Sequence, residues 1–185
     1  MAWIDTIDLD DAPEDLQPLY DEIINTRGKV SNILKVHSLN PSALAAHLEL
    51  YDTLLFGQSD LRRAEREAIA VVVSAENGCR YCVRHHGEAL AAYWDRARVD
   101  RLAADHAEMD DLEPKLRRAC TVAAKLTRAP DAMSKTDVDR LRDAGWSDRS
   151  ILDIVLITAY FNFVNRIANG LGVEVTAAEA TGYEY

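Results

Sequence analysis

The chain has 185 residues, of which 48% are hydrophobic and 28% charged, and its formal net charge is −10. This length and apolar content fit one globular domain with a sizeable core and exclude an intrinsically disordered chain. The negative charge argues against nucleic acid and acidic membrane surfaces as partners, because binding to a phosphate backbone requires a basic face.

Helical periodicity runs through the chain, and patterns typical of β-strands are nearly absent. Capping residues or proline at the start and glycine at the end mark most of the expected helices. These helices cover, in chain order, residues 13–26, 30–38, 41–56, 61–76, 79–98, 100–109, 112–127, 135–144 and 148–169. We therefore predict an all-α protein.

We expect three parts in a single domain. Residues 1–60 form a helical extension packed on the core, residues 61–172 form the core helical domain, and residues 173–185 form a tail. The longest apolar run, residues 154–164, is too short for a membrane span and predicts a buried core helix. The N-terminus lacks a basic start followed by an apolar block, which favours a cytoplasmic protein without a signal peptide.

The residues best suited to chemistry lie near a predicted helix break at Asn77 and Gly78. Either residue can cap the next helix, which places Cys79 in its first turn. A helix N-terminus favours a thiolate over a thiol. Cys79, Cys82 and His86 follow at spacings of three and four residues, so they share one helix face and His86 can accept a proton from Cys82.

Glu67 belongs to the preceding helix, ten residues before Asn77, whereas His86 follows Asn77 by nine. If the two helices form an antiparallel hairpin, both side chains lie about 14–15 Å from the turn, given the ~1.5 Å rise per residue. We therefore predict a contact between Glu67 and His86. In such a contact the carboxylate orients the imidazole and raises its basicity.

The spacing of Glu67, Cys79, Cys82 and His86 resembles that of the alkylhydroperoxidase D-like proteins of the carboxymuconolactone decarboxylase superfamily, in their peroxidase-related branch. The resemblance is clearest from residue 61 to residue 94, and the segment 160–172 is similar to the last core helix of that branch. It implies an alkylhydroperoxidase D-like helical bundle. It also implies a homo-oligomer, as a dimer, trimer or hexamer.

For the reaction, the resemblance implies a thiol-dependent hydroperoxide reductase, an antioxidant enzyme with no cofactor other than its own redox-active disulfide. Cys82 is similar to the family's peroxide-attacking thiolate, Cys79 to its resolving partner, and Glu67 and His86 to its proton relay. The implied partners are a hydroperoxide substrate and a dithiol or lipoyl-bearing protein as reductant. Tyr81 stands where the best-known members have a histidine, and we expect it to be a hydrogen-bond donor rather than a base.

Several other interpretations stay open. A structural zinc site would use the two cysteines and His86 but needs a fourth ligand, and two inert buried cysteines are a further alternative. A lactone decarboxylase or isomerase, or a thiol sensor without turnover, would also fit the superfamily or the motif. Cys120 is expected in the core and His85 at the surface or an interface. Asn165 and Arg166 are expected to form a buried polar pair that fixes helix packing or an oligomer contact, with contact to a substrate as the alternative.

Overall fold

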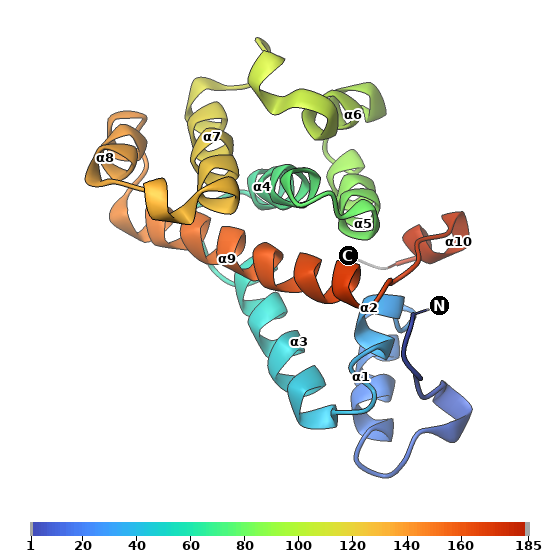
Figure 1. The fold of residues 1–185 in the computed structure, drawn as a ribbon. Coiled ribbons are helices and arrows are strands. Elements are labelled where there is room, and N and C mark those ends of the chain that lie inside the picture. The colour runs from blue at the N-terminus through green and yellow to red at the C-terminus, as the bar shows by residue number, and fades with distance from the viewer. Residues whose placement is uncertain (1, 184–185) are drawn as a thin grey trace.

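The computed structural model describes residues 2–183, and α-helices make up most of this part of the chain (Figure 1). The elements are, in chain order, η1 (Leu9–Asp11), α1 (Gln17–Arg27), α2 (Asn32–Lys35), α3 (Pro41–Leu55), α4 (Arg63–Glu76), α5 (Arg80–Ala91), α6 (Arg96–Asp105), η2 (His106–Glu108), α7 (Pro114–Arg128), η3 (Pro130–Ala132), α8 (Lys135–Asp143), α9 (Asp148–Gly170) and α10 (Ala177–Ala180). Residues 2–183 contain no β-strand, which confirms the all-α prediction.

Helix α4 lies at the centre of the core. Every residue from Glu65 to Ser74 is buried, and α5, α7 and α9 pack around the helix. Ile69 and Val73 belong to one apolar cluster, whereas Ala68 and Val72 belong to a second cluster shared with α6 and α7. A polar side chain on this helix is therefore cut off from water and must find its partners inside the protein.

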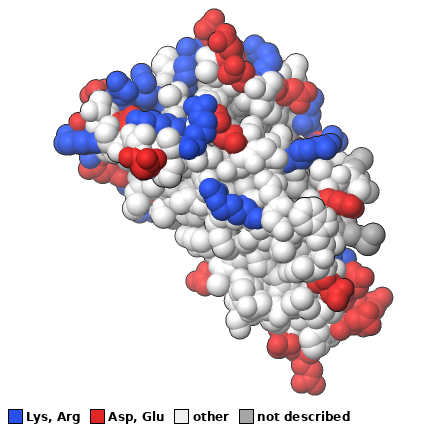
Figure 2. Space-filling view, in the orientation of Figure 1, with Lys and Arg blue, Asp and Glu red and all other residues white. Residues whose placement is uncertain are grey.

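Helix α9 is the long helix that crosses the molecule in Figure 1. By length and composition it could span a membrane, but over half (56%) of its most apolar window is buried in the protein. It packs against α3, α4 and α7, as expected for a core helix. Leu152, Leu156 and Phe163 remain exposed on it. Figure 2 shows a largely uncharged band across the middle of the face in view, with charged side chains gathered toward its two ends.

The N-terminal helices α1 to α3 have an apolar cluster of their own, which includes Tyr20, Ile23 and Leu44. A buried arginine of α4 fastens this part to the core. The Arg66 guanidinium donates hydrogen bonds of 2.9–3.3 Å to the backbone carbonyls of Leu54, Leu55, Gly57 and Leu61. The carbonyls at the end of α3, which have no partner within the helix, are thereby satisfied.

Several helix ends differ from the sequence expectation because a different residue supplies the cap. Helix α4 begins after Arg62, since the Glu65 carboxylate accepts the Arg62 N–H at 2.7 Å. Helix α5 ends at Ala91, because Asp95 caps the separate helix α6. Helix α9 continues through Gly170, and the turn is made by Gly172, whose φ is 60°.

Candidate active site

The break between α4 and α5 sets the position of the first cysteine. Gly78 has a φ of 61°, a left-handed conformation that strongly favours glycine. The Cys79 N–H bonds to the Ser74 carbonyl and the Gly78 N–H to the Ala75 carbonyl, the pair of bonds typical of a Schellman turn. Cys79 is consequently the N-cap residue of α5, one position earlier than the first helical turn predicted from the sequence.

The two thiols of the motif lie together beneath a cavity. Cys79 is 0% and Cys82 2% exposed, and neither forms a disulfide in this structure. A hydrogen bond from Cys82 lowers the pKa of Cys79 and outweighs the opposing effect of burial, with help from the Tyr81 and Cys82 amides. The same thiol–thiol bond, together with burial, raises the pKa of Cys82 well above its ordinary value. The thiol–thiol hydrogen bond thus favours the charged form of Cys79 and the neutral form of Cys82.

Asn165 of α9 forms hydrogen bonds with both thiols of this pair. Its side-chain amide lowers the pKa of both thiols by hydrogen bonding. The amide also bonds to Ser74 Oγ at 3.1 Å and to Asn77 Nδ2 at 3.0 Å, and the side chain is fully buried. The sequence predicted a buried packing role for Asn165, which is confirmed, but Arg166 is exposed and bonds to Asn162 instead.

The predicted contact between Glu67 and His86 is present. Glu67 Oε2 lies 2.7 Å from His86 Nδ1, and the glutamate side chain is fully buried. Burial by itself would raise the pKa of Glu67, but His86 and Arg63 together bring this pKa below its ordinary value. The carboxylate is therefore charged, and it fixes the imidazole with Nδ1–H as donor and Nε2 as the nitrogen available to a substrate.

Arg63 is a second partner of Glu67 that sequence reasoning missed. Its Nε donates to Glu67 Oε1 at 2.8 Å, and its guanidinium lies 3.8 Å from the centre of the Phe56 ring. The spacing of four residues between Arg63 and Glu67 was the available signal, because residues at i and i+4 meet on a helix.

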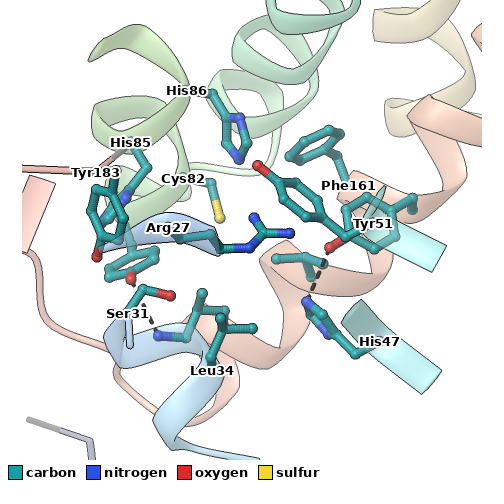
Figure 3. A pocket seen from close by; sticks show the side chains of 14 residues that line it. Arg27, Ser31, Leu34, His47, Tyr51, Cys82, His85, His86, Phe161 and Tyr183 are labelled. Carbon is teal, nitrogen blue, oxygen red and sulfur yellow. Dashed lines mark hydrogen bonds between the residues drawn. The ribbon is translucent and has the colours of Figure 1, made fainter. Parts of the chain in front are cut away.

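A cavity of about 70 Å³ opens above Cys82 (Figure 3). Its lining residues come from both ends of the chain as well as the core: Arg27, Ser31, Ile33, Leu34, His47, Tyr51, Tyr81, Cys82, His85, His86, Tyr160, Phe161, Val164 and Tyr183. A cavity that encloses benzene measures about 150 Å³, so this one suits a smaller ligand. In residues 2–183 no group of three or more His, Cys, Asp or Glu is arranged to hold a metal ion.

Tyr81 contacts the C-terminal segment. Its hydroxyl donates to Glu179 Oε1 at 2.7 Å and accepts the Ile33 N–H at 3.2 Å. The predicted hydrogen-bond donor is thus present, but its acceptor is a carboxylate that the sequence did not suggest. Glu179 also accepts the Asn32 N–H at 2.7 Å, so one carboxylate joins the C-terminal segment to α2 and α5.

Two further sequence expectations can be compared with the structure. His85 is 8% exposed and stacks on the Tyr81 ring at 4.3 Å between centroids, so of its two predicted places the surface is wrong, whereas an interface stays a prediction. The reason is the C-terminal segment, which covers that face of α5 through Glu179 and Tyr183. Cys120 is fully buried in the core as predicted, and burial raises its pKa to about 12.

Comparison with known proteins places these features in a family. Residues 41–93 match the model of the carboxymuconolactone decarboxylase family. A peroxidase-related protein from Silicibacter sp. TM1040 has a similar structure, with a TM-score of 0.88 and 33% identity over 97% of this chain and 94% of its own. A peroxidase-related protein from Ralstonia eutropha JMP134, described as an alkylhydroperoxidase AhpD core, has the same TM-score and coverage at 29% identity.

Two more distant similarities are consistent with this result. The protein YdfG of Bacillus subtilis (strain 168) is 28% identical over 116 residues, which are 62% of this chain and 78% of YdfG. The debrominase Bmp8 shares the fold at 22% identity, with a TM-score of 0.79 over 94% of this chain and 92% of its own. By the family match and the full-length structural similarity at 33% identity, the chain belongs to the alkylhydroperoxidase D-like and carboxymuconolactone decarboxylase superfamily.

Proposed function

We propose that the protein is a thiol-dependent hydroperoxide reductase that cycles between the Cys79–Cys82 dithiol and its disulfide. One observation carries this proposal: Cys82 and His86 line the same cavity, with a second thiol and a buried carboxylate as their respective partners. An inert pair of core cysteines would need neither the cavity nor the imidazole. The geometry supports Cys82 as nucleophile, His86 as proton carrier and Cys79 as resolving thiol, all within two successive turns at the start of α5.

The first step is attack by the Cys82 thiolate on the terminal oxygen of the hydroperoxide. Cys82, which is hydrogen-bonded to Cys79, first gives its thiol proton to His86, a residue that lines the same cavity. An S–O bond then forms and the O–O bond breaks, which leaves Cys82 as a sulfenic acid and releases an alkoxide. His86 passes this proton to the alkoxide, which leaves as an alcohol.

The second step closes the disulfide. The Cys79 sulfur attacks the Cys82 sulfur, the S–S bond forms as the S–O bond breaks, and the departing hydroxide takes up the Cys79 thiol proton to become water. A dithiol, such as a lipoyl-bearing or other dithiol protein, then restores both thiols by two exchange reactions and becomes a disulfide itself. The chain's own sulfurs carry both electrons, so no further cofactor enters the cycle.

Single-cysteine variants test the proposal. Wild-type protein should lose two thiols per chain on treatment with hydrogen peroxide, and Cys120→Ser should behave in the same way because Cys120 lies in the other apolar cluster. Cys82→Ser should lose none. Cys79→Ser should stop at a sulfenic acid on Cys82, which a sulfenic-acid-specific dione labels and mass spectrometry locates.

The same experiment separates the competing functions. Unchanged thiols with no peroxide consumed would refute the proposal. A disulfide that forms only once, with a change in oligomer size and without turnover in the presence of dithiothreitol, would indicate a redox sensor. Lactone conversion that survives in a Cys79→Ser, Cys82→Ser double variant would indicate a lyase or isomerase.

A further inference from the structure

The cavity contains a cation that the proposed peroxide chemistry does not use. Arg27, at the end of α1, lines the cavity together with Cys82, and its side chain is only 14% exposed. Figure 3 shows the guanidinium extending into the cavity between Cys82 and Tyr51. The carbon at its centre lies 4.6 Å from the centre of the Tyr51 ring. Its ion-pair partner Asp52 is 54% exposed, so water screens that pair.

A buried imidazole on the same wall has a nitrogen without a partner. His47 is 6% exposed, and its Nε2 lies 3.0 Å from the Tyr160 hydroxyl. Its Nδ1 has no hydrogen-bond partner among residues 2–183. Burial lowers the pKa of His47 to about 3, with smaller contributions from His37 and Arg27, so the ring is neutral near pH 7. Nδ1 itself has almost no accessible surface, so a ligand in the cavity does not reach it, and the neutral ring adds no charge to this wall.

Arg27 therefore sets the chemistry of a ligand. A guanidinium requires an acceptor, and a carboxylate offers two acceptor oxygens in the plane that a guanidinium recognises. A single cation matches a single negative charge better than the two charges of a phosphate. The rest of the lining mixes apolar side chains such as Ile33 and Leu34 with polar ones such as Ser31 and Tyr51, and among residues 2–183 Arg27 is its only arginine or lysine.

We propose that this cavity takes small oxidants that carry a carboxylate, which binds to Arg27 while the hydroperoxide group lies at Cys82. The assignment rests on the proposed function for the reacting group, but the carboxylate site is defined without it. Near Arg27, the other charged groups are Asp52, Arg63 and the buried Glu67, which already has Arg63 and His86 as partners. Arg27 is therefore the cation left to hold the ligand.

Alkylation of Cys82 tests the carboxylate site without any peroxide. Iodoacetate and iodoacetamide have nearly the same size and react at the same carbon, but only iodoacetate is negatively charged. The rate of Cys82 modification by each reagent is measured by peptide mass spectrometry, and the iodoacetate-to-iodoacetamide ratio is compared between variants. Arg27→Gln should lower this ratio about tenfold or more, the scale expected for loss of a charge-assisted hydrogen bond.

Matched variants make the result decisive. Arg142→Gln removes the same charge from an exposed arginine that pairs with Asp139 and Asp148, and should leave the ratio unchanged. Asp52→Asn removes the competing carboxylate while Arg27 stays in place, and should raise the ratio; this variant also serves if Arg27→Gln does not fold. Equal slowing of both reagents in Arg27→Gln would overturn the proposal, because Arg27 would then act on the thiolate alone.

The outcome is also independent of the enzymatic assignment. A ratio that depends on Arg27 in a protein that consumes no peroxide would support the carboxylate site and refute the peroxidase. Peroxide turnover with a ratio that does not change in Arg27→Gln or Asp52→Asn would support the peroxidase and refute the carboxylate site.

Discussion

The two walls of the cavity differ in how their residues are brought together. What we call the catalytic wall consists of Cys82, His86 and Phe161, with Glu67 behind His86. It is built mainly from one local helical hairpin, α4 and α5. The opposite wall, here the N-terminal wall, consists of Arg27, Ile33, His47 and Tyr51 and depends on the packing of α1, α2 and α3 against the core.

Under the proposed function, this difference separates the groups that would react from the groups that would select a ligand. Helix α4 is buried from Glu65 to Ser74, so the position of its side chains depends little on the N-terminal helices. The N-terminal wall is held to the core by a few long-range contacts, notably those of Arg66. Changes in the N-terminal wall should therefore alter substrate choice or stability before they alter the sulfur chemistry.

The largest effect is expected on the catalytic wall. His86→Asn keeps a donor for Glu67 but removes the nitrogen that carries the proton, and should slow Cys82 oxidation by about 10²–10⁴-fold, the usual contribution of a general acid–base group. Stopped-flow measurement of the first oxidation step checks this, with the urea midpoint as the control for folding. A rate within threefold of wild type would show that the imidazole does not carry the proton in this step.

Loss of the hydrogen bonds from Arg66 to the end of α3 should lower the stability of the protein strongly. Arg66→Met fills the same space but leaves several buried carbonyls without a donor, and we expect the free energy of unfolding to fall by about 3–5 kcal/mol. Urea denaturation followed by circular dichroism measures this loss. A matched Arg149→Met change on the exposed surface of α9 should cost less than about 1 kcal/mol. Similar losses in both variants would show that Arg66 does not fasten the N-terminal helices.

The N-terminal wall should make stability depend on pH. His47 has a pKa of about 3 in the folded protein and about 6.5 when unfolded, so the unfolded state binds more protons between these values. Stability is thus lost as the pH falls below about 6.5, by up to about 2 kcal/mol at pH 5. His47→Gln should lose less between pH 7 and pH 5 in urea titrations, and parallel losses would contradict the burial of a neutral ring.

The smallest effect concerns the C-terminal segment. Tyr81→Phe removes the hydrogen bond to Glu179 and should cost about 1 kcal/mol or somewhat more, because the acceptor is charged. Faster amide hydrogen exchange in α10 would report the loosening, while thiol reactivity should change little. A large drop in Cys82 oxidation would instead assign Tyr81 to the catalytic wall.

The sequence was sufficient to predict the contact between Glu67 and His86 of the catalytic wall, but it did not predict which residues form the N-terminal wall. Glu67 and His86 could be matched because helix rise converts sequence position into height along a hairpin, and their contact followed. Arg27 and His47 could not be placed in the cavity, because nothing local records how α1 and α3 pack. The Tyr81–Glu179 contact joins residues 98 apart, and its absence from the prediction explains the error at His85.

The place of Cys79 at the start of α5 also has a thermodynamic consequence. The amides of Tyr81 and Cys82 stabilise a negative sulfur, but a disulfide sulfur carries no charge for them to stabilise. Formation of the proposed disulfide would therefore lose an interaction that is available to a Cys79 thiolate, and the reduction potential of the couple would shift toward more oxidising values. Reduction of that disulfide by a dithiol partner would become more favourable.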